Sequence, residues 1–222
     1  MGTTLRVIEI FESLQGEGHW TGTPMTFVRL AGCNAPALGL ECVSWCDTRE
    51  SWDAESGVEM GVAAIINQVY LPRLCLTGGE PLLQIEGVRE LMAAAHGRGL
   101  RVHLETNGTV DPQVVTGSPA ASPCAGSPLF SESDWVVVSP KPPSYFIASG
   151  WMGEVSELKL IADERLDTAT AERLAAEHPA ALVCIQPEYK MGRRSVDKTV
   201  EMVRSHPDWR FSFQMHKFLG IR

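Results

Sequence analysis

The fold is decided by the stretch Arg73–Pro81, which reads RLCLTGGEP. Its first residues, Arg73–Thr77, form a short apolar segment typical of a buried strand, and two glycines follow at once. Residues Leu82–Arg98 then place apolar side chains at helical spacing. A strand that turns through glycines directly into a helix is the repeating unit of a parallel α/β sheet. The glycines also leave the backbone open to a ligand, although a plain turn with Pro81 near the first helical position is the alternative.

The same alternation continues on both sides of this stretch. Strands are predicted at Leu5–Phe11, Pro24–Ala31, Leu100–Leu104, Trp135–Val138, Glu157–Ile161, Leu182–Ile185 and Arg210–Phe213, and helices at Val58–Val69, Leu166–His178 and Ser195–His206, the last with Ser195 as N-cap. This order predicts a parallel sheet with helical crossovers. A complete eight-stranded barrel takes about 250 residues, so 222 residues favour a partial, incomplete TIM-like barrel in one domain spanning 1–222. Residues 111–133, rich in Pro and Ser, are expected to form a surface insertion.

Composition narrows the class of protein. Hydrophobic residues make up 44% and charged residues 21% of the chain, as in ordinary globular proteins. The net charge of −8 argues against binding nucleic acid through bulk electrostatics. No apolar run approaches the roughly 18 residues of a membrane span, and the first residues lack the pattern of a signal peptide. A cytoplasmic protein that binds a small molecule is expected, in which clustered cysteines indicate metal or redox chemistry rather than disulfides.

Three of the six cysteines lie within the segment Gly32–Thr48, which reads GCNAPALGLECVSWCDT. Three thiolates in one loop, with no fourth soft ligand in that loop, suit an iron–sulfur cluster that leaves one iron open. A structural zinc site would need a fourth protein ligand. Cys75 and Cys184 lie inside apolar strands and are expected to be core residues, whereas Cys124 falls in the Pro-rich insertion.

Polar motifs directly follow four of the predicted strands. These motifs are Thr77–Glu80, Glu105–Asn107, Ser139–Lys141 and Gln186–Glu188. The carboxyl ends of parallel strands converge on one edge, where open α/β sheets and barrels carry their ligand site. One such motif could be a helix cap or a turn, but four in succession predict a shared ligand site. Within the first motif, Glu80 could hold an ammonium group or a neighbouring loop.

Three further features could also contact a ligand, and one of them, His216, follows the last predicted strand at this same edge. The loop Ser13–Gly18, SLQGEG, has two glycines around a carboxylate, so the backbone can approach a ligand closely there. Arg29 interrupts an apolar strand and needs an anionic partner, which could be a structural carboxylate or a ligand carboxylate. His216 follows the last strand and could bind an anion or move a proton near neutral pH. His103, inside a strand, is expected to be a core residue instead.

These motifs together resemble those of the 7-carboxy-7-deazaguanine synthase family, which are radical S-adenosylmethionine (SAM) lyases of queuosine and 7-deazapurine biosynthesis. The shared segments cover nearly the whole chain: Leu14–Gly18, Phe27–Cys33, Trp45–Thr48, Thr77–Pro81, Glu105–Gly108, Ser139–Lys141, Gln186–Pro187 and the tail Gln214–Arg222. The first and last of these are the more specific, since many radical SAM enzymes share several of the others. The cysteine spacing departs from the common Cys-x3-Cys-x2-Cys pattern, because eight residues separate Cys33 from Cys42 and three separate Cys42 from Cys46.

The resemblance implies a set of cofactors and ligand residues. Cys33, Cys42 and Cys46 would bind one [4Fe–4S] cluster, and Thr48 would ligate a Mg2+ ion that also meets the substrate carboxylate. The SAM site would be lined by Trp45, Cys46, Asp47, Gly79, Ser139, Pro140, Lys141, Gln186, Pro187, Glu188 and Tyr189. The substrate would be held by Leu14, Gln15, Gly16, Arg29, Thr77, His216 and the carboxylate of Arg222.

The resemblance also implies the reaction. The family converts 6-carboxy-5,6,7,8-tetrahydropterin to 7-carboxy-7-deazaguanine by a radical ring contraction with loss of ammonia. The cofactors carry out the difficult step, so no side chain beyond those that hold cofactors and substrate is assigned to catalysis. An electron donor such as flavodoxin or ferredoxin and a homodimeric assembly are implied as well.

Two other functions stay open from the sequence. Another radical SAM enzyme, such as one that places a radical on a partner protein, would share the cluster and the Gly-Gly-Glu-Pro motif. It would have no use for Arg29, Thr48 and His216 as a pterin pocket. A non-catalytic zinc-binding module would bind one zinc per chain without visible absorbance or SAM, and it would leave the four strand-end motifs unexplained.

Overall fold

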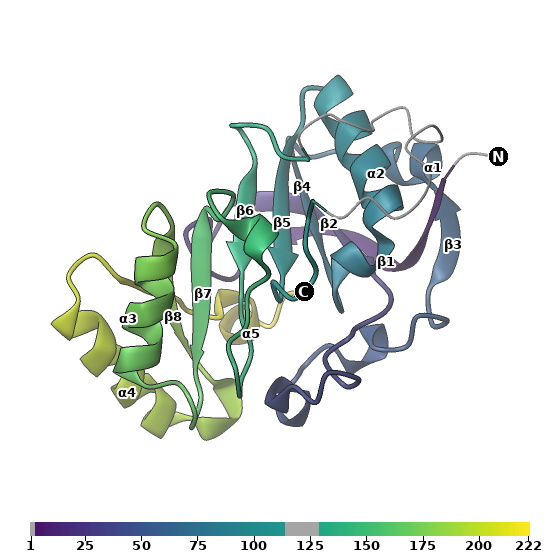
Figure 1. Ribbon diagram of the computed structural model, residues 1–222. Coiled ribbons are helices and arrows are strands. Elements are labelled where there is room, and N and C mark those ends of the chain that lie inside the picture. The colour runs from purple at the N-terminus through teal and green to yellow at the C-terminus, as the bar shows by residue number, and fades with distance from the viewer. Residues whose placement is uncertain (1–2, 114–128) are drawn as a thin grey trace.

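The computed structural model describes residues 3–113 and 129–222. Within these residues one sheet has the strands β1 (Thr4–Leu14), β2 (Pro24–Leu30), β3 (Val58–Gly61), β4 (Arg73–Gly78), β5 (Arg101–Thr106), β6 (Trp135–Val138), β7 (Glu157–Ala162), β8 (Leu182–Pro187) and β9 (Arg210–Phe211) (Figure 1). Their spatial order is β3-β1-β2-β4-β5-β6-β7-β8-β9. Cys124 and most of the insertion predicted at 111–133 lie outside the described residues.

The sheet is an open, mostly parallel one. β1 pairs antiparallel with β2 and β3, and every pairing from β2 through β9 is parallel. In the part of the chain that the structure describes, β3 and β9 end the sheet and are not paired with each other. The prediction of a partial barrel with parallel strands is confirmed.

The α-helices connect and cover these strands. They are α1 (Val62–Ile66), α2 (Ile85–Gly97), α3 (Thr168–Glu177), α4 (Arg193–Ser205) and α5 (Met215–Leu219). Figure 1 shows α1 and α2 at the end of the sheet that holds β1 and β4, and α3 and α4 beside β7 and β8. Across the described ranges, no helix has the length and apolar character needed to traverse a lipid bilayer.

The central strands bury an apolar face and a polar face. Along β7, Leu158 and Leu160 pack in the main hydrophobic core, whereas Lys159 between them lines the cavity described below. Leu74 and Leu76 of β4 lie in the same core. Since successive side chains of a strand point to opposite faces, the helices cover one apolar face and leave the other for polar side chains.

The predicted helix at Val58–Val69 is wrong over its first turn. Val58–Gly61 forms the edge strand β3, paired antiparallel with Thr4–Val7 of β1, and only Val62–Ile66 is α-helical. Helical spacing of apolar side chains is a local signal. The free edge of β1 outweighs this local signal at Val58–Gly61, because the edge supplies backbone hydrogen-bond partners to the segment.

The predicted N-cap at Ser195 is also wrong. Helix α4 begins at Arg193, and Gly192 is its N-cap. Ser195 is buried, and its hydroxyl donates to Ala162 O at 2.6 Å and accepts from Glu188 N at 2.7 Å. These bonds fix the start of α4 against the ends of β7 and β8.

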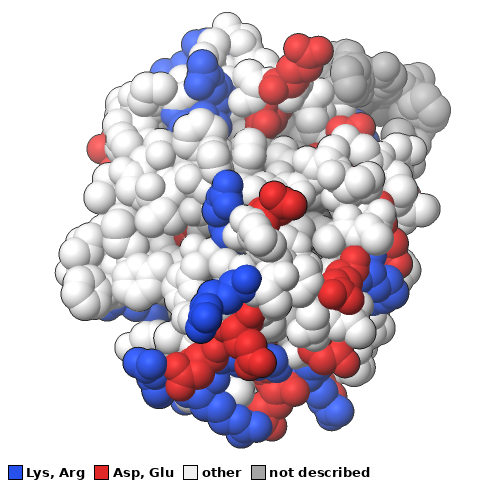
Figure 2. All heavy atoms as spheres, turned by 90° about the vertical axis from the view of Figure 1, so that its left-hand side faces the viewer, with Lys and Arg blue, Asp and Glu red and all other residues white. Residues whose placement is uncertain are grey.

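Charges of both signs are mixed on the surface. On the face shown in Figure 2, Lys and Arg side chains alternate with Asp and Glu toward the lower end. Within α3 and α4, Arg173 pairs with Glu177 and Arg193 with Asp197, each at 2.8 Å. The described residues of this face form no continuous positive surface.

Candidate active site

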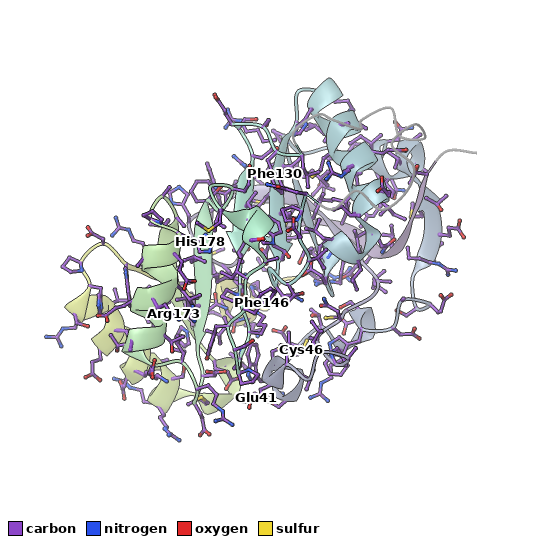
Figure 3. The ribbon with its side chains drawn as sticks, in the orientation of Figure 1. Glu41, Cys46, Phe130, Phe146, Arg173 and His178 are labelled. Atoms are coloured by element: carbon purple, nitrogen blue, oxygen red, sulfur yellow. The ribbon has the colours of Figure 1, made fainter. Side chains whose placement is uncertain are left out.

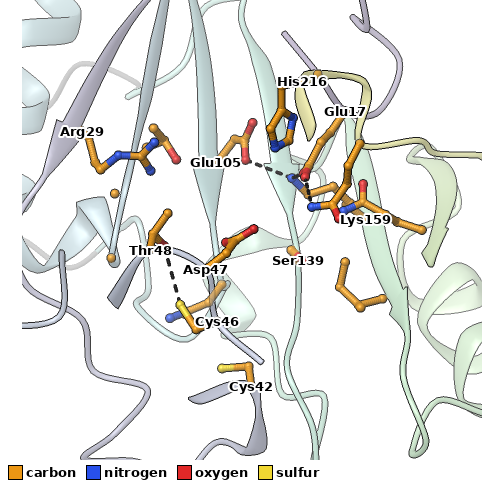
Figure 4. A pocket seen from close by; sticks show the side chains of 18 of the residues that line it. Glu17, Arg29, Cys42, Cys46, Asp47, Thr48, Glu105, Ser139, Lys159 and His216 are labelled. Carbon is orange, nitrogen blue, oxygen red and sulfur yellow. Dashed lines mark hydrogen bonds and ion pairs between the residues drawn. The ribbon is translucent and has the colours of Figure 1, made fainter. Parts of the chain in front are cut away.

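A cavity of about 550 Å3 opens at the carboxyl ends of the parallel strands. Its walls come from the strand ends, from the cysteine loop and from the C-terminal tail (Figure 4). Every residue that the sequence assigned to the cluster, SAM, Mg2+ or substrate lines it, except Pro140, which lies between two residues that do. Motifs that are far apart in the sequence therefore meet in one place, and their roles as ligands stay predictions.

The cysteine loop is folded around a short 3-10 helix, η1 (Glu41–Ser44). Cys46 N donates to Cys42 O at 2.8 Å, and Cys33 N donates to Trp52 O at 3.1 Å. Cys42 is buried, whereas Cys33 and Cys46 are half-buried. Burial raises the pKa of the Cys33 thiol and raises that of Cys42 to about 11. Metal binding at neutral pH would therefore release protons from these thiols.

The spacing of the three sulfurs bears on the kind of metal centre. Thiolates around one tetrahedral zinc lie about 3.8 Å apart, since each Zn–S bond is about 2.3 Å. Among the described residues, the group of His, Cys and acidic ligand atoms that lie within 4.8 Å of one another is Cys75, His103 and Glu105, not the three loop cysteines. At least one pair of sulfurs among Cys33, Cys42 and Cys46 is therefore more than 4.8 Å apart, which is wider than the ligand spacing around one zinc ion.

Gly79 lets the end of β4 touch the start of the cysteine loop. A Cβ atom on Gly79 would lie 2.2 Å from Gly32 O and 2.7 Å from the Cβ of Cys33, so no larger residue fits without displacing the loop. Glu80 N donates to Gly32 O at 2.8 Å across the same contact. The end of β4 and the start of the cysteine loop are therefore joined by a direct backbone contact.

Glu80 is fully buried and ties β4 to β5. Its carboxylate accepts from Leu82 N at 3.1 Å, Thr106 Oγ1 at 2.8 Å and Asn107 N at 2.7 Å. Asn107 Nδ2 in turn donates to Asn34 Oδ1 in the cysteine loop at 2.9 Å. Of the two partners predicted for Glu80, the structure shows the neighbouring loop.

Arg29 of β2 lines the cavity and has a structural carboxylate as its partner. Its Nε lies 2.9 Å from Glu9 Oε1 on the neighbouring strand β1. Glu9 also pairs with the Arg222 guanidinium at the C-terminus. One carboxylate thus holds two arginines at the cavity wall, on the side where Figure 4 places Thr48.

The C-terminal tail forms another wall. The first amide of α5 (Met215–Leu219) donates to Gly16 O at 2.8 Å, and a Cβ on Gly16 would lie 2.1 Å from His216 Nδ1. Lys217 pairs with Asp47 of the cysteine loop. Burial raises the pKa of Asp47, but the Lys217 ammonium outweighs it and the pKa lies below its usual value. The tail therefore links the loop after β1 to the cysteine loop.

A buried ion network that the sequence analysis missed forms the wall opposite Arg29. Lys159 Nζ donates to Glu17 Oε2 at 2.6 Å and to Glu105 Oε2 at 2.9 Å. Gln15 Nε2 donates to the other oxygen of Glu105 at 2.9 Å, and Gln214 Nε2 donates to Glu17 Oε1 at 2.7 Å. The charged side chains of Lys159, Glu17 and Glu105 are 7%, 15% and 21% exposed, and all three line the cavity.

This network stays charged at physiological pH. Burial opposes charge on Glu105 and Lys159, but their mutual attraction outweighs it. The pKa of Glu105 lies well below its ordinary value and the pKa of Lys159 lies well above. The sequence did carry a signal, because a lysine between two leucines of a buried strand requires an anionic partner.

A layer of buried side chains lies beneath this network. His103 Nε2 is 3.2 Å from Gln15 Nε2 and 3.6 Å from Glu105 Oε1. Cys75 and Cys184 are buried as well, so the prediction that these three are core residues is confirmed.

The remaining wall follows β6 and β8. Lys141 Nζ donates to Ser139 Oγ at 2.6 Å and lies 5.6 Å from the ring centroid of Trp45, and burial lowers the pKa of Lys141. Glu188 accepts from Lys190 N at 2.9 Å, so its carboxylate caps the short helix η5 (Tyr189–Met191). This wall faces the cysteine loop with a cation and several backbone groups.

Known proteins share this chain's sequence over nearly its whole length. No protein-family model matches it. It is 31% identical to the 7-carboxy-7-deazaguanine synthase of Synechocystis, with 97% of this chain and 93% of the relative covered. It is 36% identical to the enzyme of that name from Bacteroides thetaiotaomicron, with 98% of each covered. It is 35% identical to that of Rhodospirillum rubrum, with 99% and 94% covered.

One solved structure shares the fold. QueE from Escherichia coli superposes with a TM-score of 0.70 over 96% of this chain and 95% of that chain. The sequence identity is 23%, so the likeness bears on the architecture of the sheet and its helices.

Proposed function

The chain belongs to the 7-carboxy-7-deazaguanine synthase family, and we propose that it converts 6-carboxy-5,6,7,8-tetrahydropterin to 7-carboxy-7-deazaguanine by radical ring contraction with loss of ammonia, a step toward queuosine. One observation carries the proposal. A single cavity is lined by the three loop cysteines, by all four strand-end motifs and by the tail residues His216 and Arg222. The chain is a radical SAM lyase, and its substrate is a small molecule.

Cys33, Cys42 and Cys46 would hold a [4Fe–4S] cluster that leaves one iron open for SAM. Their place in one cavity wall and their wide spacing support this set. Cluster and SAM, when bound, supply the one-electron chemistry that yields a hydrogen-abstracting radical. The burial of Cys42 and the half-burial of Cys33 and Cys46 would shield that chemistry from water.

SAM would lie between the cysteine loop and the ends of β4, β6 and β8. The residues around it would be Trp45, Cys46, Asp47, Gly79, Ser139, Pro140, Lys141, Gln186, Pro187, Glu188 and Tyr189. Gly79 supports this placement, because it has no side chain and its backbone lies next to Cys33. Lys141, held by Ser139 at 2.6 Å, offers a cation for a carboxylate on the same side.

The substrate would lie against Leu14, Gln15, Gly16, Arg29, Thr77, His216 and Arg222. Its carboxylate would share a Mg2+ ion with Thr48, whose Oγ1 lies 3.6 Å from Cys46 Sγ. A hydroxyl is one neutral ligand, so the carboxylate and water would complete the roughly six oxygens that Mg2+ takes. The reacting end of the pterin would then lie beside the cysteines.

We also propose a cytoplasmic location and a homodimeric assembly. The reaction takes an electron from outside, so a flavodoxin or ferredoxin is the proposed donor. Free thiols fit a cytoplasmic, reducing compartment. Phe213, Phe218 and Leu219 of the tail are 48%, 79% and 51% exposed, which supports a homodimer.

We also propose that the chain is one radical SAM domain, because residues from Glu9 to Arg222 line the same cavity.

The test is an anaerobic assay. The protein is reconstituted with iron and sulfide, reduced, and given SAM, Mg2+ and 6-carboxy-5,6,7,8-tetrahydropterin, and mass spectrometry then looks for 7-carboxy-7-deazaguanine. Product formation is expected. Release of 5′-deoxyadenosine without a deazapurine would keep the radical SAM assignment and reject this substrate. A colourless protein loaded with zinc would reject both.

Two cysteine variants locate the cluster. Cys42→Ala is expected to lower the iron content and abolish product formation, because it removes one cluster thiolate. Cys184→Ala is the matched control, since Cys184 is a buried thiol that does not line the cavity. It is expected to keep both iron and activity, and a loss of iron in Cys184→Ala alone would overturn the ligand set.

A further inference from the structure

We propose that Lys159 is a substrate-positioning residue that fixes the pterin by donating a hydrogen bond to the oxo group of its pyrimidinone ring. The inference rests on the proposed function, since it names the part of that substrate which Lys159 meets. It goes beyond the cluster, SAM and substrate residues that the family resemblance implies, because Lys159 is in none of those sets.

Lys159 offers one free N–H donor to the cavity. An ammonium carries three N–H donors. Two of them are engaged by Glu17 Oε2 at 2.6 Å and Glu105 Oε2 at 2.9 Å. Within the described residues the third has no acceptor, and the side chain lines the cavity while being only 7% exposed. A buried donor without a partner is costly, so a ligand acceptor at this point would be bound tightly.

Lys159 is held in its charged form by two carboxylates. Glu17 and Glu105 come from the loop after β1 and from β5, and they hold the ammonium from two sides. Their charges keep the pKa of Lys159 well above its ordinary value. Lys159 is therefore a fixed donor that cannot act as a base near neutral pH, which is the property of a positioning group.

The charge around Lys159 favours a neutral acceptor. Two carboxylates and one ammonium give this group a net charge of −1, which disfavours a second anion such as the substrate carboxylate. A neutral oxo group suits the donor, and remaining lone pairs of the two carboxylates suit the ring N–H and amino donors beside it. Figure 4 shows Lys159 and Glu17 across the pocket from Arg29 and Thr48, the side proposed for the carboxylate.

A metal ion fits this corner poorly. The ligand atoms of Cys75, His103 and Glu105 lie within 4.8 Å of one another. However, the Lys159 ammonium already holds Glu105 at 2.9 Å, and burial raises the pKa of the Cys75 thiol well above its ordinary value. A cation there would be repelled by Lys159 and would have to displace a proton from a buried thiol.

The test compares two pteridines that differ at position 4 of the ring, where an oxo group beside a ring N–H is replaced by an amino group beside an unprotonated ring nitrogen. The probes are 6-carboxypterin, which has the ring oxo group, and 2,4-diaminopteridine-6-carboxylate, in which an amino donor replaces it. Isothermal titration calorimetry measures the Kd of each. The wild-type protein is expected to bind the oxo compound about ten- to hundredfold more tightly, the range of one hydrogen bond to a charged group. Equal affinities in the wild type would overturn the proposal without any variant.

Lys159→Met should remove this preference. We expect its Kd for 6-carboxypterin to rise about ten- to hundredfold and the two pteridines to bind within about threefold of each other. The Kd for SAM, whose site uses other residues, should not change. Because Lys159→Met leaves two buried carboxylates unpaired, the double variant Lys159→Met/Glu17→Gln restores the charge of −1 and serves as a second, better-folded test. A retained wild-type preference in either variant would overturn the proposal.

The control and the remaining outcome separate this inference from the proposed function. Lys198→Met removes a half-buried lysine of α4 that does not line the cavity, and it is expected to keep wild-type affinities. An equal loss of preference in Lys198→Met would overturn the inference. A wild type that makes the deazapurine but does not discriminate would overturn the inference alone. A wild type that binds neither pteridine and makes no product would overturn the proposed function and the inference with it.

Discussion

At the scale of single residues, the hydrogen bond from Trp52 to Cys46 bears on the electron that the proposed cluster accepts. The indole Nε1 donates to Cys46 Sγ at 3.4 Å. A donor at a cluster sulfur stabilises the more negative, reduced state and so raises the reduction potential. Trp52→Phe removes the donor and keeps an aromatic ring. We expect the midpoint potential to fall by about 40 mV, the equivalent of roughly 1 kcal/mol for one electron, in a redox titration followed by electron paramagnetic resonance.

A second tryptophan offers the control for that measurement. Trp209 is buried and stacks on His206 with ring centroids 3.8 Å apart, outside the cavity lining. Trp209→Phe should keep the wild-type potential. A Trp52→Phe protein with full iron content and an unchanged potential would show that the bond does not tune the cluster.

His178 gives a residue-scale prediction on pH. It lies at the end of α3, apart from Cys46 in Figure 3, and burial lowers its pKa below the ordinary value. Below about pH 6.5 the unfolded chain binds a proton there that the folded chain does not. Its contribution to stability is thus present above that pH and is lost as pH falls through the lower folded pKa. We expect the free energy of unfolding to fall between pH 7.5 and 5.5, by at most about 1.4 kcal/mol per pH unit from this group.

Urea unfolding of His178→Gln across the same pH range checks the assignment. The variant should show a smaller loss of stability on acidification than the wild type. His206 is the contrasting case, because its bonds to Met202 O and Glu172 raise its pKa. His206→Gln should change the pH slope in the opposite direction, and identical slopes in the two variants would contradict both assignments.

A site residue could be predicted from the sequence when it stood just beyond an apolar segment, and it was missed when it stood inside one. Residues just after a predicted strand, such as Ser139, Lys141 and Gln186, were found because polar motifs follow apolar segments there, although β8 extends through Gln186 in the structure. Lys159 was missed because it lies inside β7, where one charged residue is easily read as part of an apolar run. The partners that define its role, Glu17 and Glu105, are 142 and 54 residues away, and only the folded sheet brings them together.

At the scale of elements, the contact between the end of β4 and the cysteine loop predicts the effect of a single methyl group. In Gly79→Ala the new Cβ would lie 2.2 Å from Gly32 O, a backbone atom that moves only with the loop. We expect a destabilisation of about 1–3 kcal/mol and a several-fold lower iron content after reconstitution. Thermal unfolding and iron analysis measure the two effects.

Gly97→Ala is the matched control for that change. Gly97 is the last residue of α2, and a Cβ there would meet no atom within 4 Å. Alanine favours the helix, so this variant should keep its iron and gain up to about 0.5–1 kcal/mol. A Gly79→Ala protein that loads iron as well as Gly97→Ala would show that the backbone contact does not hold the cysteines in place.

The elements that the sequence predicted well are those whose local signal and tertiary surroundings agree. Trp135–Val138 has the same bounds in the structure, and the other central strands differ by a few residues at their ends. Val58–Gly61 was predicted as helix but forms a strand, because it pairs with the edge of β1. Ser195 was predicted as an N-cap, but its hydroxyl forms hydrogen bonds to a residue of β7 and a residue after β8 instead of capping its own helix. In both cases, contacts between elements determined the local structure and outweighed the local sequence preference.

At the scale of the whole molecule, the open sheet followed from chain length and from the alternation of strands and helices. Its parallel run, β2 and β4–β9, needs no information beyond the order of elements and the preference for helical crossovers. The antiparallel start of the sheet could not be predicted in the same way. The pairing of β3 with β1 joins residues that are 51 to 57 positions apart, such as Val7 with Val58 and Thr4 with Gly61, and the sequence shows no turn signal that fixes it.

The tail leads to the prediction on assembly. Phe218 is 79% exposed, its ring lies 5.9 Å from that of Phe213, and Leu219 beside it is 51% exposed. If a second copy covers these side chains, as proposed, Phe218→Glu places a charge in an apolar interface. We expect the variant to be monomeric by size-exclusion chromatography with light scattering. Tyr70→Glu is the control, because Tyr70 is 75% exposed elsewhere, and it should keep the wild-type mass.

Assembly and substrate binding should be coupled through this tail. Helix α5 carries both Phe218 and His216, and His216 lines the cavity. A monomer frees α5 on its outer side, so its position against Gly16 should be held less firmly. We therefore expect monomeric Phe218→Glu to bind 6-carboxypterin several-fold more weakly while its Kd for SAM changes little. A monomeric wild type would contradict the homodimer, and a monomeric variant with unchanged pteridine affinity would show that α5 is fixed by its own chain alone.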